Sequence, residues 1–323
     1  MIPNRLVHRL LHAEQTGLFL ALALLCIVIG SLTPVFFTAV NLANVLRDAA
    51  LVAIAAIGMV MIILQGEIDL SVGSTQAVVG IVAVYLLNTT ESVALALLLS
   101  LCVGAAIGVV NGLLVTRAQI NSLIATLGMM AILRGTAMVS TGAVSIQAKV
   151  DGFVEVGTGH LGPIPVPVLM AAVLFAAFWF VLHHTPFGRY IYAIGGNREA
   201  AELAGLPVQR IKVTVFVIGA MLASLSAFIL ASRLNSGQPN AGLGFELQVI
   251  AAVVLGGISL TGGIGTLVGA LIGVLILTVL NNGLVLLNVS SFYHDIARGF
   301  VIILAVYLDT RRRRSLARRQ AGH

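Results

Sequence analysis

The chain has 323 residues, of which 59% are hydrophobic and 9% are charged, and its mean hydropathy is +1.06. This composition is typical of a membrane protein with many spans and excludes a water-soluble enzyme domain. The net charge of +6 does not indicate nucleic-acid binding. The basic residues gather in RRRRSLARR (311–319), directly after an apolar run, where anionic lipid headgroups attract them.

Apolar runs separated by polar or glycine-rich segments predict the membrane helices. A span needs roughly 20 apolar residues, so the composition predicts an all-α fold of about ten helices. The first run is longer than the core of a signal peptide and is expected to be retained. The predicted spans are Leu18 to Phe37, Ala49 to Leu64, Leu70 to Leu87, Val93 to Thr116, Ser122 to Ser140, Val166 to Leu182, Val213 to Ala231, Glu246 to Leu260, Leu267 to Leu287 and Tyr293 to Leu308.

Basic residues are distributed unequally between the two sets of loops. If both termini are cytoplasmic, only Arg47, Lys149 and Arg233 remain outside, as the positive-inside rule prefers. Residues 1–323 are expected to form one transmembrane domain in this orientation. Its predicted parts are a cytoplasmic loop over residues 183–212, external loops over 141–165 and 232–245, and a basic cytoplasmic tail over 309–323.

Polar and charged residues interrupt the apolar runs. A buried charge in a membrane helix costs about 2.5–3.5 kcal/mol on insertion scales, so each should face a cavity, a partner or a helix end. Arg134 and Arg298 lie in outer parts of their helices and are expected to snorkel, with Asp295 one turn from Arg298. The candidates for hydrogen-bonding groups along a translocation path are Glu67, Asp69, Ser71, Asn111, Ser259 and Asn282.

Two pairs of similar segments indicate an internal repeat. The glycine-rich LGGISLTGGIG (255–265) resembles QGEIDLSVGS (65–74) at an offset of 190 positions, whereas Asn282-Gly283-Leu284 repeats Asn111-Gly112-Leu113 at an offset of 171. Transporters are often built from repeats with interrupted helices at the substrate path. Because the two offsets differ, a single duplication does not account for both matches.

Motifs of known chemistry are missing. The sequence has no GxxxxGK[ST] phosphate loop, GxSxG elbow, HExxH pair or CxxC motif. Cys26 and Cys102 lie in apolar runs without metal-ligand neighbours. We expect no enzymatic activity, metal site or cofactor in this chain. The intramembrane carboxylates and the possible repeat leave an ion-coupled secondary transporter open as an alternative.

The segment GRYIYAIGGNREAAELAGL (188–206) places a charged helix between two apolar runs. Its Glu-Ala-Ala, followed by Gly205 after three further residues, resembles the EAA loop of ATP-binding-cassette importer permeases. Together with GEIDLSVGS, SLIATLGMMAILRGTA, RLNSGQPNAGLGFEL and IAAVVLGGISLTGGIGTLVGALIGVLIL, it makes the chain resemble the permeases of ribose-type monosaccharide importers over nearly its whole length.

This resemblance implies the importer permease fold, with ten helices in each subunit and a cytoplasmic coupling helix. It also implies the bacterial inner membrane, a second permease copy or related chain, a cytoplasmic ATPase that binds ATP, and a periplasmic sugar-binding protein. Related permeases of the same architecture import branched-chain amino acids or nucleosides, so the cargo stays open. The residues implied to contact the ATPase are Arg198, Glu199, Ala200, Ala201, Glu202 and Gly205.

The chain departs from the family's pattern at three places. Glu67 stands where a second glycine is common, and Ser122-Leu123 stands where Pro-Phe is common. After the external loop, Gln248 stands where an aspartate is common. All three positions could touch the path, so the resemblance does not identify the sugar.

Overall fold

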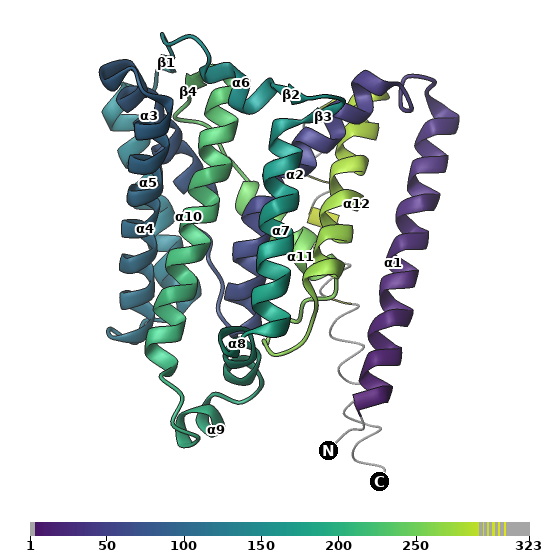
Figure 1. Ribbon diagram of the computed structural model, residues 1–323, viewed down its shortest axis with the longest axis vertical. Coiled ribbons are helices and arrows are strands. Elements are labelled where there is room, and N and C mark those ends of the chain that lie inside the picture. Colours follow the sequence, from purple (N-terminus) through teal and green to yellow (C-terminus); the bar gives the residue numbers. More distant parts are fainter. Residues whose placement is uncertain are drawn as a thin grey trace.

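The computed structural model describes residues 4–290 and residues 293, 296, 299, 300, 303 and 307, with side chains from residue 15 onward. Within this part of the chain, eight helices are long and apolar enough to cross a membrane. Figure 1 shows that they form one bundle with similarly directed axes. The long helices are α1 (Asn4–Leu32), α2 (Ala39–Leu64), α3 (Val72–Thr90), α4 (Val93–Thr116), α5 (Ser122–Thr141), α7 (Val166–His184), α10 (Val208–Leu234) and α12 (Leu267–Leu286).

Short elements mark the two ends of the bundle, except for the short helix α11 (Phe245–Leu255), which lies between the ends (Figure 1). The strands β1 and β4, and likewise β2 and β3, pair antiparallel at the end where α6 also lies, which we call the strand end. The helices α8 and α9 lie at the opposite end, which we call the α9 end. The short elements are β1 (Ile146–Gln147), α6 (Phe153–Thr158), β2 (His160–Leu161), β3 (Ile164–Pro165), α8 (Pro186–Gly196), α9 (Arg198–Leu203), β4 (Ser236–Gly237) and α11 (Phe245–Leu255).

The predicted all-α membrane fold is confirmed, but three predicted spans need comment. α2 begins ten residues earlier than predicted, at Ala39, because the Thr38 hydroxyl caps it by accepting from the Asn41 N–H. The predicted span from Glu246 to Leu260 is wrong. α11 has 11 residues and ends where glycine-rich residues 256–266 begin, so it is too short to cross. The predicted last span, the Asp295–Arg298 pair and the basic tail fall mostly or wholly outside the described residues.

The structure contains an inverted repeat. The helices α10, α11 and α12 begin 169, 173 and 174 positions after α2, α3 and α4. Each runs opposite to its counterpart along the bundle: α2 descends toward the α9 end, whereas α10 ascends from it (Figure 1). The repeat therefore follows the Asn111/Asn282 match at 171 positions. The similar segments that lie 190 positions apart are not counterparts in this repeat. They are two glycine-rich breaks, one after α2 and one after α11, and they contact each other: Gly263 N–H donates to the Leu64 carbonyl at 2.8 Å.

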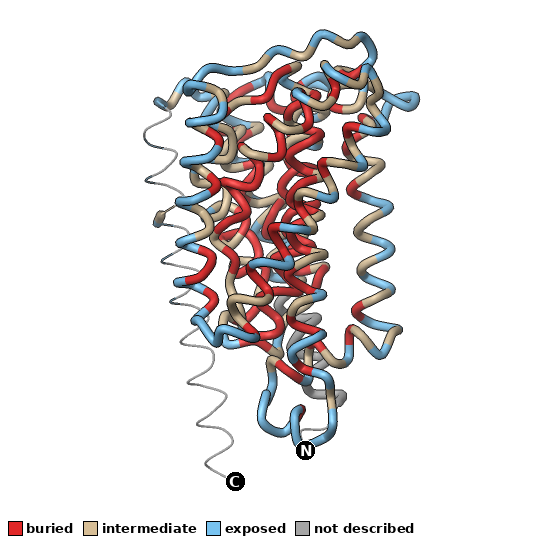
Figure 2. Tube along the Cα trace, turned by 90° about the vertical axis from the view of Figure 1, so that its left-hand side faces the viewer, coloured by how far each residue is buried: buried red, intermediate tan, exposed pale blue. Residues whose placement is uncertain are grey.

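The centre of the bundle is α10, which packs against α2, α3 and α4. Gly104, Gly108 and Gly112 stand at four-residue spacing on α4 and face α10. A Cβ on Gly108 would lie 2.6 Å from the Phe216 carbonyl oxygen, so only glycine permits this approach. Such small-xxx-small packing brings membrane helices into backbone contact. Figure 2 shows the buried residues gathered in the interior of the bundle.

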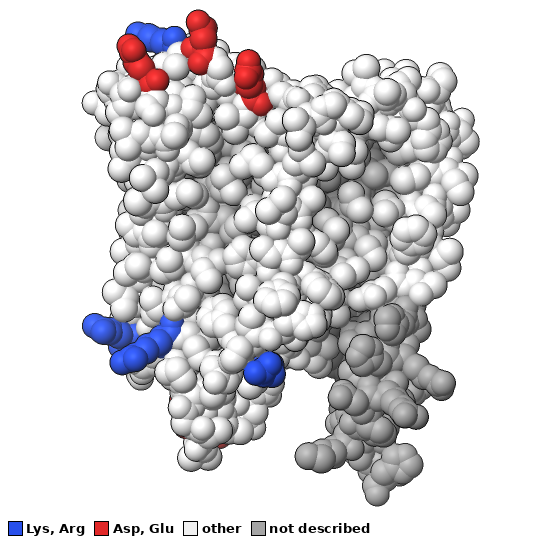
Figure 3. Space-filling view, in the orientation of Figure 1, with Lys and Arg blue, Asp and Glu red and all other residues white. Residues whose placement is uncertain are grey.

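The outer surface is apolar between the two ends. Figure 3 shows charged side chains at both ends of one face and an uncharged band between them. Phe19, Leu24 and Ile27 of α1 are each more than 60% exposed. Because the hydrocarbon of a bilayer solvates such side chains, this band matches the part of the chain expected in lipid.

Arg134 does not snorkel as predicted. Its Nη1 donates to the backbone carbonyls of Pro239 and Ala241, at 2.8 Å each. These carbonyls belong to the irregular segment between β4 and α11, whose polar groups need partners within the bundle. Arg134 therefore ties α5 to the segment that leads into α11.

Candidate functional site

The segment between α7 and α10 forms two short helices beyond the bundle (Figure 1). Side-chain caps begin both: Thr185 Oγ1 accepts from Gly188 N–H at 3.3 Å, and Asn197 Oδ1 accepts from Ala200 N–H at 3.0 Å. Gly205 has φ +79, in the left-handed region that favours glycine, so the chain turns sharply after α9. The six residues predicted to contact an ATPase lie on α9 or on this turn.

α9 has an inward and an outward face. Ala201 is buried against the core of the bundle, whereas Leu203 is 90% exposed. Arg198 Nε donates to Glu202 Oε1 at 2.9 Å, and Glu199 is exposed beside this ion pair. Ala201 therefore positions α9, and Leu203 with the charged side chains forms the surface open to a partner.

α8 packs directly against the two glycine-rich breaks. A Cβ on Gly195 would lie 1.8 Å from the Leu64 carbonyl oxygen and 2.6 Å from the Gly263 nitrogen. The Tyr192 hydroxyl donates to the Gly265 carbonyl at 3.0 Å. Burial raises the pKa of Tyr192 to about 12, so the hydroxyl remains a hydrogen-bond donor even in alkaline solution. A displacement of α8 would therefore also displace both breaks.

Glu67, a predicted path residue, forms an ion pair with Lys212 of α10. The two side chains are 13% and 6% exposed. Lys212 lies near the start of α10, just after α9, and Glu67 lies in the break that follows α2. The ion pair thus links the start of α10 to the break after α2.

Asp69, Ser71 and Asn111 form one buried cluster. Asp69 Oδ1 accepts from the backbone N–H and the hydroxyl of Ser71, at 2.8 and 2.6 Å, and Asn111 Nδ2 donates to Ser71 Oγ at 2.9 Å. Hydroxyls of α5 accept from the backbone N–H groups of Ile68 and Leu70. Irregular backbone inside a membrane protein needs such partners. The hydrogen bonds of this cluster therefore stabilise the irregular backbone that follows α2.

The remaining two predicted path residues lie apart from each other. Ser259 is 2% exposed within the second break, with its Oγ 3.4 Å from Thr261 Oγ1. Asn282 of α12 exchanges two hydrogen bonds with Asn41 of α2, at 3.1 and 2.8 Å. Of the six predicted path residues, Asn282 is the one that lines the cavity described next.

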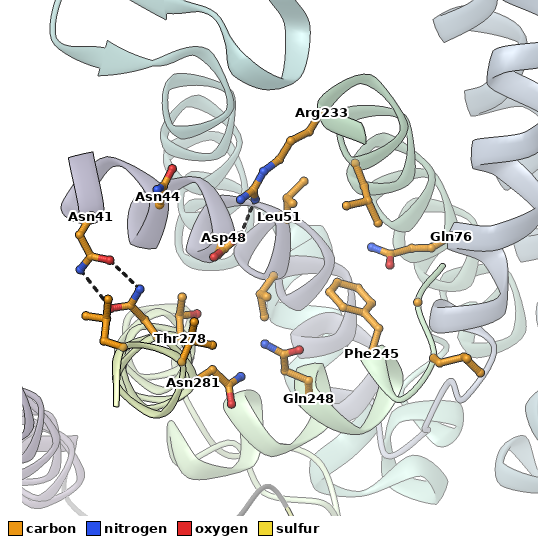
Figure 4. A pocket seen from close by; sticks show the side chains of 17 residues that line it. Asn41, Asn44, Asp48, Leu51, Gln76, Arg233, Phe245, Gln248, Thr278 and Asn281 are labelled. Carbon is orange, nitrogen blue, oxygen red and sulfur yellow. Dashed lines mark hydrogen bonds and ion pairs between the residues drawn. The ribbon is translucent and has the colours of Figure 1, made fainter. Parts of the chain in front are cut away.

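A cavity of about 660 Å³ lies between α2, α10, α11 and α12 (Figure 4). Its walls come from the strand-end halves of α2, α10 and α12, and its floor comes from residues near the starts of α3 and α11. The volume falls within the range of small-molecule sites. The lining residues are Asn41, Asn44, Asp48, Leu51, Val52, Gln76, Leu230, Arg233, Gly242, Leu243, Phe245, Gln248, Thr278, Asn281, Asn282, Val285 and Leu286.

The polar lining of the cavity consists mainly of neutral amides. Its two charged side chains, Asp48 and Arg233, form an ion pair with each other (Figure 4). Amides both donate and accept hydrogen bonds, as sugar hydroxyls do. The arrangement therefore suits an uncharged ligand that carries several hydroxyl groups.

The sequence-based reasoning missed most of these cavity residues because it weighted charges in apolar runs above amides. A signal was present. Asn41, Asn44 and Asp48 recur at helical spacing, as do Thr278 and Asn282, so each set lies on one helix face. Which of the many helix faces meet around a cavity depends on tertiary packing.

Comparisons with known proteins agree with this geometry. Residues 41–306 match the family described as branched-chain amino acid transport system, permease component. The chain is 46% identical to the ribose import permease protein RbsC of Escherichia coli, over 93% of this chain and 94% of that protein. It is 44% identical to RbsC of Bacillus subtilis, over 93% and 94%. It is 40% identical to the L-arabinose ABC transporter permease protein AraH of Azospirillum brasilense, over 93% and 88%. No solved structure matches.

Proposed function

The chain belongs to this family of transport-system permease components, and on that premise we propose that it is the membrane subunit of an ATP-binding-cassette importer for a monosaccharide. The observation that carries the proposal is the amide-lined cavity, whose chemistry suits a neutral polyhydroxylated cargo. The relatives named for ribose and L-arabinose favour a pentose. Branched-chain amino acids and nucleosides are the rival cargoes of the same architecture.

Alternating access at this cavity is the proposed mechanism. The cavity lies toward the strand end, and the two contacting breaks lie between its floor and the α9 end. Movement of α8 and α9 would shift the breaks through Gly195 and Tyr192, and so open a path toward the α9 end. The chain itself binds no ATP in this mechanism.

The α9 end is proposed to face the cytoplasm of the bacterial inner membrane. Arg117, Arg189 and Arg210 all lie at this end, whereas Asp151 and Glu155 lie at the strand end. The positive-inside rule favours that orientation. It brings α9 to a cytoplasmic ATPase and the strand end to a periplasmic sugar-binding protein, while a second permease copy completes the transporter.

Leu203→Asp is expected to abolish ATP-driven uptake and leave the unfolding temperature unchanged, because the side chain is 90% exposed. Truncating an interface hot spot typically costs about 2 kcal/mol or more, so binding of the ATPase should weaken by roughly 30-fold. Co-purification with the ATPase measures this loss. Leu203→Met is the matched control and should bind normally. An ATPase that binds Leu203→Asp as tightly as the wild type would contradict the assigned docking face.

A further inference from the structure

Three polar side chains on one side of the cavity have no hydrogen-bonding partner within the described part of the chain. They are Gln248 on α11 and Thr278 and Asn281 on α12. Thr278 is 3% exposed, and its Oγ1 is buried without a partner. A helical threonine hydroxyl can satisfy itself on the carbonyl four residues earlier, as Thr214 does with Arg210. A buried polar group without a partner is costly, and Gln248 and Asn281 beside it line the cavity with unpaired amides, which points to a ligand that supplies hydrogen-bonding partners there.

Other polar side chains around the cavity are already engaged. Asn41 and Asn282 bond to each other through both amides. Gln76 Nε2 donates to Ser226 Oγ at 3.0 Å. Hydrogen-bonding capacity left for a ligand is therefore concentrated where α11 and α12 meet.

Phe245 stands beside Gln248 (Figure 4). It lies one turn before Gln248 on α11 and also lines the cavity (Figure 4). A monosaccharide has an apolar C–H face and a rim of hydroxyl groups. Small-molecule sites combine apolar or aromatic surface with a few placed polar groups in this way.

We infer that Phe245, Gln248, Thr278 and Asn281 form a subsite that reads the hydroxyl pattern of a neutral monosaccharide during its passage. The inference rests on the proposed function and adds to it the residues that select among sugars. None of the four side chains is charged, and the nearby Asp48 and Arg233 neutralise each other. Each amide can donate to one hydroxyl and accept from another, so loss of one hydroxyl leaves an amide unpaired.

The test compares uptake of labelled D-ribose and 2-deoxy-D-ribose in proteoliposomes that contain the permease, its ATPase and its sugar-binding protein. Selection by the binding protein is the same for every permease variant, so any change in the ribose-to-deoxyribose rate ratio belongs to the permease. We expect the alanine variant that removes the amide bound to the 2-hydroxyl, Gln248→Ala or Asn281→Ala, to change this ratio by about tenfold, the effect of one hydrogen bond. The control Gln147→Ala, which removes an exposed amide outside the cavity, should leave the ratio unchanged.

The outcomes separate the subsite from the proposed function. Wild-type liposomes that accumulate neither of these sugars nor L-arabinose or any other monosaccharide offered would overturn the proposed function. Wild-type uptake with an unchanged ratio in both alanine variants, including equal slowing of both sugars, would overturn the subsite alone. If an alanine variant fails to insert, the near-isosteric Gln248→Glu and Asn281→Asp replace it. These substitute a carboxylate for the amide and must also change the ratio if the subsite is correct.

Discussion

Replacing Lys212 with methionine is expected to lower the free energy of unfolding by about 3–5 kcal/mol, the usual cost of leaving one charge of a buried pair without its partner. Glu67 would keep its carboxylate in a site where its side chain is only 13% exposed. Methionine preserves the apolar stem of lysine, so packing should change little. Denaturant unfolding of the purified protein in detergent measures the loss.

A double variant separates the charge from the packing. Glu67→Gln combined with Lys212→Met should recover most of the lost stability, because neither side chain then carries a charge. The exposed pair Arg198–Glu202 supplies the control: its side chains are 53% and 48% exposed. Removing it by Arg198→Met should cost less than about 1 kcal/mol. Equal losses of stability from Lys212→Met and Arg198→Met would contradict a stabilising role for the buried Glu67–Lys212 pair.

Gly195→Ala should disrupt the contact between α8 and the two breaks. The added Cβ would lie 1.8 Å from the Leu64 carbonyl oxygen, and backbone atoms cannot move aside as a flexible side chain can. Overpacking a well-packed site costs about 1–3 kcal/mol, and a backbone clash belongs at or above the upper end. We expect a lower unfolding temperature, and we expect slower uptake because a displaced α8 loses its contact with Leu64 and Gly263.

The neighbouring glycine is a closely matched control. A Cβ on Gly196 would meet nothing within 4 Å, and Gly196 is exposed. Gly196→Ala should therefore stay within about 0.5 kcal/mol of the wild type, as most surface substitutions do. Equal effects of the two substitutions on stability and uptake would contradict the packing of α8 against Leu64.

Local composition predicted most of the fold. Uninterrupted apolar runs with polar ends predicted α4 with its structural bounds, and predicted α5 to within one residue. The start of α2 was predicted ten residues too late, because its first ten residues include Arg47 and Asp48, and charged residues are typical of a loop. In the structure Asp48 pairs with Arg233, a residue 185 positions away. Sequence alone does not reveal a partner so distant.

The coupling segment could be predicted from the sequence more fully than the cavity. The coupling segment is contiguous, so its Glu-Ala-Ala pattern and Gly205 could be recognised without tertiary information. The cavity is assembled from five separate elements, and its amides differ little from ordinary polar residues near helix ends. Asp69 and Asn111 drew attention as intramembrane polar groups, yet they bond within a buried cluster. A polar residue in an apolar run thus indicates a partner, and only packing tells whether that partner is protein or cargo.

ATP-dependent uptake of a sugar distinguishes an ATP-driven importer from a gradient-driven transporter. Labelled D-ribose, L-arabinose and L-leucine would be offered to proteoliposomes that contain the permease, the ATPase and the sugar-binding protein. We predict that a pentose accumulates only with ATP and the binding protein, and that Glu199→Lys and Gly205→Pro abolish this accumulation. Accumulation that needs no ATP, follows a proton or sodium gradient and ignores both substitutions would contradict the account.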